Sequence, residues 1–194
     1  DITFNSIVEI HKNITIDINE KTLTGTAEKF FRVFADVRFE KGNIVNNTNN
    51  GRCVETRAAD IALELDNVSL IAENGASQPL TIGGSGDNIA VNINASEINA
   101  GKYGYAVIVF NPVQMNIESS IVKGWSALYF KGEDNSLGSA GSVVNVNNSE
   151  ITGTNHVSAS DPTNTFATIQ FEDENVTLNV NGDSNLGAYE GAGG

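Results

Sequence analysis

The sequence predicts an all-β protein built as a parallel β-helix, a solenoid of about seven coils. Three observations support this prediction. One alternating apolar and polar pattern recurs along nearly all of the 194 residues. No segment keeps an apolar period of 3.6 residues over the length of a helix, so little or no helix is expected. The chain also contains 26 Asn, a residue that is unfavourable in helices and in ordinary strands but suits turns and stacked columns.

The recurring unit reads apolar, polar, apolar, polar, and a further apolar residue follows seven positions after the first. Val91-Asn92-Ile93-Asn94, followed by Ile98, is one example. The units start at Ile16, Val37, Leu63, Val91, Met115, Val144 and Leu178. In the last unit the further apolar residue, Leu186, comes eight positions after the first. Alternation with a period of two is typical of strands with one buried face.

A second apolar run follows each of the first six units, at residues 30–34, 53–54, 80–82, 105–110, 127–130 and 167–171. Each unit therefore supplies two or three short strands, and a single unit cannot bury its own inner face. Stacking the units in parallel pairs every strand with its equivalent in the next unit, at about 4.8 Å. The inward Ile, Val and Leu columns then form one continuous core.

The length suits one domain of ordinary size, and three segments are expected along it. Residues 1–13 form an N-terminal cap or a partial coil, and residues 14–187 form the parallel β-helix. Residues 188–194 are a Gly-rich tail, interpreted as a truncation or a linker. Because this end has no obvious cap for an exposed strand edge, we expect a larger parent polypeptide. Cys53 stands alone in an apolar segment and is interpreted as a small buried hydrophobe.

The charge is distributed unevenly. The chain has 24 acids and 11 bases, a net charge of −13, and residues 1–57 hold eight of each sign. The acidity therefore belongs to the later two thirds. This balance argues against nucleic acid as a partner, because phosphate binding needs clustered Lys and Arg. No apolar run is long enough to span a membrane, so no membrane insertion is expected of this segment.

Segments such as Val91-Asn92-Ile93-Asn94-Ala95-Ser96-Glu97-Ile98 and Val144-Asn145-Val146-Asn147-Asn148-Ser149-Glu150-Ile151 carry a resemblance. They are similar to the right-handed parallel β-helix repeats of large surface proteins from gut Gram-positive bacteria, and more distantly to those of pectate-lyase-like proteins. The resemblance covers residues 14–187. It implies a single-stranded, right-handed solenoid and an extracellular or cell-surface location. Its implication for function is weak, because one fold hosts many activities.

The outward positions of the units predict a candidate ligand face. In a β-helix the second and fourth positions of successive units become two parallel columns, with Asp17 in the second-position column. A set of four aromatic residues from two consecutive coils is added, because aromatics beside a polar face stack on sugar rings. The candidates are Asp17, Arg38, Glu40, Glu64, Asp66, Asn92, Asn94, Glu118, Tyr103, Tyr105, Trp125 and Tyr129. The alternative interpretation is a solvated polar ladder with the aromatics used for packing.

The expected function is a non-catalytic extracellular surface domain that acts as an adhesin or spacer, with glycans or a host surface protein as partners. The alternative is a polysaccharide lyase or glycoside hydrolase acting on an acidic, plant or host polysaccharide. Glu40, Glu64 and Asp66 meet the carboxyl spacing of an inverting glycosidase, but repetition alone produces such spacings. The motifs of polygalacturonases are absent. No cofactor is expected, and Ca²⁺ on the acidic side chains is the alternative.

Overall fold

The computed structural model describes residues 1–84, 86–133, 138–154 and 167–188. Within these residues the chain forms nineteen β-strands and no helix. The strands are β1 (Ile2–Phe4), β2 (Val8–Ile10), β3 (Ile14–Gly25), β4 (Lys29–Val33), β5 (Val37–Asn46), β6 (Arg52–Thr56), β7 (Ala62–Ile71), β8 (Leu80–Ile82), β9 (Ile89–Asn94), β10 (Glu97–Asn99), β11 (Tyr105–Val109), β12 (Val113–Glu118), β13 (Ile121–Gly124), β14 (Ser126–Phe130), β15 (Val143–Asn147), β16 (Glu150–Gly153), β17 (Ile169–Phe171), β18 (Thr177–Asn181) and β19 (Asn185–Ala188).

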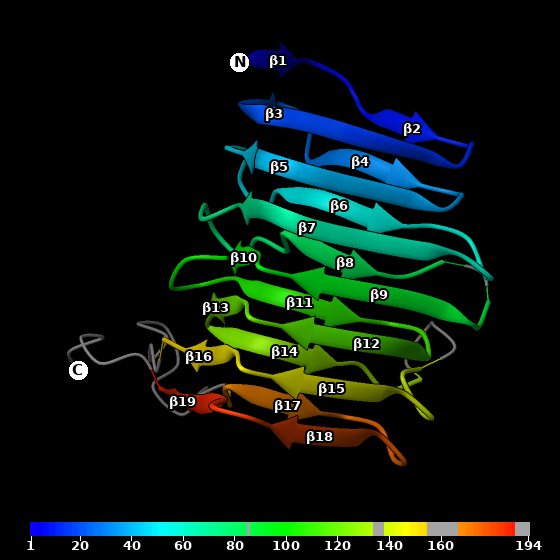
Figure 1. The fold of residues 1–194 in the computed structure, drawn as a ribbon, viewed down its shortest axis with the longest axis vertical. Helices are drawn as coiled ribbons and strands as arrows, with labels where there is room; N and C mark the ends of the chain where they lie inside the picture. The colour runs from blue at the N-terminus through cyan, green and yellow to red at the C-terminus, as the bar shows by residue number, and fades with distance from the viewer. Residues whose placement is uncertain (85, 134–137, 155–166, 189–194) are drawn as a thin grey trace.

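All strands pair in parallel, in one sheet of twelve and one of seven strands among the described residues. The pairings fall into three series that run along the stack in Figure 1. The first series joins the first halves of β3, β5 and β7 to β9, β12, β15 and β18. The second series joins β1, the second halves of β3, β5 and β7, β10, β13, β16 and β19. The third series is the seven-stranded sheet, β2-β4-β6-β8-β11-β14-β17.

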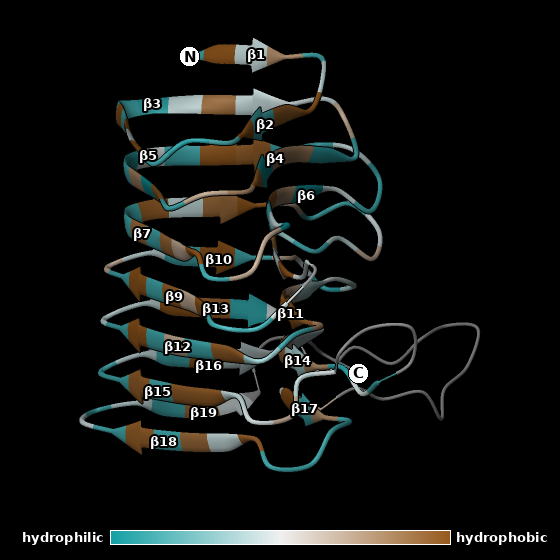
Figure 2. Ribbon diagram, turned by 90° about the vertical axis from the view of Figure 1, so that its right-hand side faces the viewer, coloured by the Kyte–Doolittle hydropathy of each residue, from teal (hydrophilic) through white to brown (hydrophobic). Residues whose placement is uncertain are grey.

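The first series keeps the register that the apolar pattern predicts from the second unit onward. Each starting residue pairs with the next, in the order Val37, Leu63, Val91, Met115, Val144 and Leu178. All of these except the partly buried Leu178 belong to the buried core. Figure 2 shows the resulting alternation of hydrophobic and hydrophilic positions along β9, β12, β15 and β18. The structure is thus all-β and parallel, an arrangement compatible with a β-helix.

The second series also has the predicted register. It contains one column of apolar residues in register, which consists of Leu23, Ile44, Leu70, Ile98, Val122, Ile151 and Leu186. The pairing of Ile151 with Leu186 confirms that the last unit carries one extra residue between its two strands. The extra residue is therefore accommodated between the strands, and the register continues to Leu186, which is partly exposed at the end of the stack.

The register predicted for the first unit is wrong by two residues. Val37 pairs with Ile14 and Phe39 pairs with Ile16, although the pattern assigned the start of this unit to Ile16. The cause is a register shift between Asp17 and Lys21, where β3 uses two more residues than β5 to turn the same corner. Counting seven residues back from Leu23 gives Ile16 as the start of the unit. The true start lies two residues earlier, because this corner contains two additional residues.

The corner between the first and second series repeats one backbone conformation. Equivalent residues of successive coils have positive φ angles: Lys41 56°, Asn67 56°, Ala95 46°, Ser119 50° and Asn148 48°. The adjacent Ser hydroxyls stack inside this corner. The backbone N–H of Ser96 donates to Ser120 Oγ at 3.0 Å, and that of Ser120 donates to Ser149 Oγ at 3.0 Å. These hydroxyls thereby satisfy buried N–H groups that the strand ladders leave unpaired.

The core at the amino-terminal end is aromatic. Phe30 and Phe31 stack with 4.2 Å between ring centroids, and Phe31 contacts Phe39 at 5.1 Å. Cys53 is fully buried beside them, as expected, and burial raises the pKa of its thiol to about 12. The described part of the chain contains no helix of the length and hydropathy that crossing a membrane requires.

Candidate functional site

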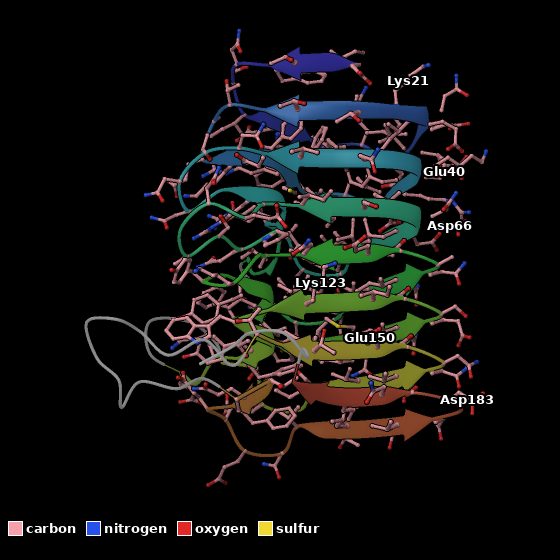
Figure 3. All side chains as sticks on the ribbon, turned by 90° about the vertical axis from the view of Figure 1, so that its left-hand side faces the viewer. Lys21, Glu40, Asp66, Lys123, Glu150 and Asp183 are labelled. Carbon is pink, nitrogen blue, oxygen red and sulfur yellow. The ribbon has the colours of Figure 1, made fainter. Side chains whose placement is uncertain are left out.

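The outer face of the first series carries two columns of polar side chains. The strand register puts Thr15, Arg38, Glu64, Asn92, Asn116, Asn145 and Asn179 in one column. The same register puts Asp17, Glu40, Asp66, Asn94, Glu118, Asn147 and Asn181 in the other. Figure 3 shows Glu40 and Asp66 on successive levels at one edge of the stack. Eight of the twelve predicted residues therefore share this face.

Asp17 occupies a different column from the one predicted. It pairs with Glu40 rather than Arg38, which follows from the two-residue shift in β3. Its carboxylate accepts the backbone N–H of Asn19 at 2.9 Å, and Lys41 Nζ lies 3.3 Å away. The backbone hydrogen bond and then the Lys41 ammonium hold the pKa of Asp17 below its ordinary value. Thr15 takes the position next to Arg38.

Arg38 is the centre of an ion-pair network on this face. Its Nε lies 2.9 Å from Glu40 Oε2, and its Nη1 lies 2.9 Å from Glu64 Oε2. Its Nη2 lies 2.5 Å from Asp66 Oδ2. One guanidinium group thus bonds to the three carboxylates whose spacing suggested a glycosidase. These hydrogen bonds raise the pKa of Arg38, and the carboxylates are engaged in a network that joins β5 to β7.

A shallow, open depression of about 390 Å³ adjoins this network. It is lined by Asn13, Ile14, Thr15, Asp36, Val37, Arg38, Ala62 and Glu64. Asp36 organises one wall, because its carboxylate accepts the backbone N–H of Ala62 at 2.9 Å and the side-chain amide of Asn13 at 3.2 Å. The depression has room for a small polar group at the amino-terminal end of the column.

Further along the same column, four Asn side chains form a continuous hydrogen-bonded ladder. Asn116 Nδ2 donates to Asn92 Oδ1 at 2.9 Å. Asn145 donates to Asn116 and Asn179 donates to Asn145, both at 2.8 Å. The amides of Asn116, Asn145 and Asn179 point the same way, since each donates to the strand of the preceding unit. Of these residues the predicted set included Asn92, and the other three occupy the same second position in later units.

The neighbouring column mixes amides with carboxylates. Asn94 Nδ2 donates to Asp66 Oδ1 at 2.9 Å, which connects the amide region to the ion-pair network. Asn147 donates a short hydrogen bond to Glu118 Oε2, and Asn148 donates to Glu118 Oε1 at 3.2 Å. These amides stabilise the ionised carboxylate, so the pKa of Glu118 lies below its ordinary value.

The four predicted aromatic residues lie elsewhere. Tyr105 and Tyr129 belong to β11 and β14 of the third series, and Trp125 immediately precedes β14. The Tyr105 ring centroid lies 5.2 Å from that of Tyr129 and 6.1 Å from that of Trp125. Tyr129 also bonds to Glu172, and Lys131 Nζ lies 4.9 Å from its ring centroid. Tyr103 lies in the turn before β11, with Lys102 Nζ 4.8 Å from its ring centroid. The candidate residues are thus divided between two sheets.

One charged cluster was not anticipated from the sequence. Glu55, in the apolar segment that contains Cys53, is buried on the third series and faces three arginines. A carboxylate inside an apolar run, with basic residues on both sides, was the signal that could have identified it. Among the described residues, no group of three or more His, Cys, Asp or Glu side chains is arranged to hold a metal ion.

Comparison of the chain with protein-family models, with curated proteins and with solved structures finds no match.

Proposed function

We propose that this chain is a single-stranded, right-handed parallel β-helix of about seven coils that serves as a non-catalytic glycan-binding domain of an extracellular, cell-surface protein. Three parallel series with a continuous core support the solenoid. The observation that carries the functional proposal is the ladder of Asn92, Asn116, Asn145 and Asn179 on an outer face. The domain acts as an adhesin or spacer.

The chemistry of this face favours neutral glycans. Side-chain amides supply both donors and acceptors, the combination that sugar hydroxyl groups require. The ladder fixes each amide in orientation, so binding does not have to order it. Around Arg38 the face holds more carboxylates than cations, because Asp17, Glu40, Glu64 and Asp66 surround Arg38 and Lys41. An acidic polysaccharide would be repelled there.

The contacts of the carboxylates support a binding role over hydrolysis or elimination. A glycosidase of the inverting type needs one carboxylic acid and one carboxylate that face the substrate. Glu40, Glu64 and Asp66 each bond to Arg38. Glu118 bonds to Asn147 and Asn148. These contacts assign the carboxylates to the network that holds the face together.

A glycan array tests this proposal. The wild-type chain is compared with N116A/N145A, which interrupts the ladder, and with E97Q/K123Q, which removes the 2.6 Å ion pair of the second series. Bound glycans are then incubated with the protein in solution, and released reducing ends and unsaturated products are measured.

We expect the wild type and E97Q/K123Q to bind the same neutral glycans, and N116A/N145A to lose them while retaining the circular dichroism spectrum of the wild type. No product should form. Binding that N116A/N145A retains in full would overturn the assignment of the face, and turnover abolished by Glu64→Gln would establish the enzyme alternative instead.

A further inference from the structure

The third series carries a second charged surface near its amino-terminal end. One column of charged residues crosses three neighbouring strands. It consists of Glu9 on β2, Arg32 on β4 and Glu55 on β6, which are in register. Lys29 and Arg52 form a second in-register pair on β4 and β6. Arg57 directly follows β6. We call Lys29, Arg32, Arg52 and Arg57 the arginine surface.

Glu55 lies beneath this surface and binds its guanidinium groups. Its side chain is 3% exposed. Arg52 Nη1 lies 2.6 Å from Glu55 Oε1, and Arg32 Nε lies 3.2 Å from Oε2. Arg57 Nη1 lies 3.8 Å from Oε1, and 44% of the Arg57 side chain remains exposed. One buried carboxylate therefore contacts three arginines, whose side chains remain partly exposed.

The charges on this surface do not balance. The carboxylates that pair with the three guanidinium groups in the described part of the chain are Glu55 and Glu9, the latter 3.5 Å from Arg32. Lys29, whose backbone is in register with that of Arg52, adds a fourth cation to these strands. The first series has the opposite imbalance around Arg38. The first 57 residues, neutral in sum, are therefore basic on one side of the stack and acidic on another.

We propose that the arginine surface binds the carboxylate or sulfate groups of an anionic polysaccharide, and that Glu55 positions the arginines for this ligand. Guanidinium groups bind such oxyanions through paired hydrogen bonds, and their attachment to Glu55 reduces the entropy lost on binding. The neighbouring strands β4 and β6 present cations about 4.8 Å apart, a spacing that suits adjacent anionic groups of one polymer.

Calorimetric titration at low ionic strength tests this inference. The probes are heparin oligosaccharides, oligogalacturonate and neutral dextran oligosaccharides, with poly-glutamate as an acidic peptide. The variant R32Q/R57Q removes two cations and leaves the Arg52–Glu55 contact in place. The matched control, K21Q/K123Q, removes two cations from strands of the second series, on the side shown in Figure 3. Thermal unfolding of each variant verifies that it is folded.

We expect one or both anionic oligosaccharides to bind and dextran not to bind this surface. R32Q/R57Q should weaken binding at least roughly tenfold and reduce its salt dependence, whereas the control should change it less than about twofold. The heparin and oligogalacturonate arms distinguish sulfate from carboxylate. Absence of binding to both, equal weakening by the control variant, or tighter binding of poly-glutamate than of either oligosaccharide would overturn the proposal. Loss of neutral glycan binding in N116A/N145A is a separate result, because those residues lie on the first series.

Discussion

The guanidinium group of Arg38 spans two neighbouring strands, with its Nη2 2.5 Å from Asp66 Oδ2 on β7. The same group binds Glu40 on its own strand and Glu64 on the next. Arg38 thereby separates three carboxylates that strand pairing brings together. Without it, like charges would face one another across adjacent strands, an arrangement that destabilises a sheet.

The first prediction concerns this network. Arg38→Gln should lower the melting temperature by roughly 2–4 °C in low salt, because Glu40, Glu64 and Asp66 then repel one another. The difference should shrink in 0.5 M NaCl, about the ionic strength at which exposed charges are largely screened. Differential scanning fluorimetry at the two salt concentrations measures both effects.

The matched control for this prediction is Lys12→Gln, which removes the same charge from an exposed site outside the network. It should leave the melting temperature nearly unchanged in either buffer. An equal decrease in both variants would mean that net charge, rather than the contacts of Arg38, is responsible.

The second prediction concerns the Asn ladder. Asn116→Ala removes two side-chain hydrogen bonds, one to Asn92 and one from Asn145, and Asn179→Ala removes one. The free energy of unfolding should fall by about 1 kcal/mol in N116A and by about half as much in N179A. Urea titrations provide these values. Equal effects in the two variants would show that the bonds along the column do not act as the structure indicates.

The third prediction concerns the Ser column in the corner. Ser120 is buried, and its hydroxyl accepts the N–H of Ser96 and donates to the carbonyl of Glu118 at 2.6 Å. Ser120→Ala leaves the buried N–H of Ser96 without this partner, while the Glu118 carbonyl keeps the N–H of Ala95, so the change should cost about 1–3 kcal/mol. The exposed neighbour Ser119→Ala should change the stability by less than about 0.5 kcal/mol. Similar values for the two variants in denaturant titrations would remove the distinction.

The fourth prediction concerns acid stability. Because the amides of Asn147 and Asn148 lower the folded-state pKa of Glu118 below 4.5, its ionised form stabilises the folded chain at neutral pH. This contribution is complete above the unfolded pKa and is lost as the pH falls through the lowered folded pKa, roughly between pH 5 and pH 3. Glu118→Gln should therefore lose less stability than the wild type over that range. Glu28→Gln, at an exposed site, is the control, and parallel pH curves for wild type and E118Q would contradict the account.

The sequence was sufficient to predict most of the strand register. The starting residues from Val37 to Leu178 pair as the apolar period requires, because a slip of one residue would turn the whole column outward. It failed at β3, where Ile14, Ile16 and Ile18 alternate through the corner and fit two registers equally well. Only the pairing with β5 distinguishes them.

The sequence predicted less of the candidate site than of the strand register. The repeat predicts that Arg38 and Glu64 share a column. It does not predict the ion pair between them, because a long side chain can reach neighbouring strands in several directions. The sequence left the aromatic residues near Trp125 open between stacking on sugars and packing, and it did not predict that Tyr105 and Tyr129 belong to another sheet than the polar columns. The three arginines around Glu55 come from two strands and a corner, which a single repeat pattern does not bring together.

The most direct test of the account is an NMR titration of the uniformly ¹⁵N-labelled chain with a neutral glycan selected on the array. The side-chain amide resonances of Asn92, Asn116, Asn145 and Asn179 should shift together and saturate with one dissociation constant, while the resonances of β11 and β14 stay in place. Shifts confined to β11, β14 and the arginine surface, with the four ladder amides unperturbed, would contradict the claim that the Asn ladder is the glycan-binding face.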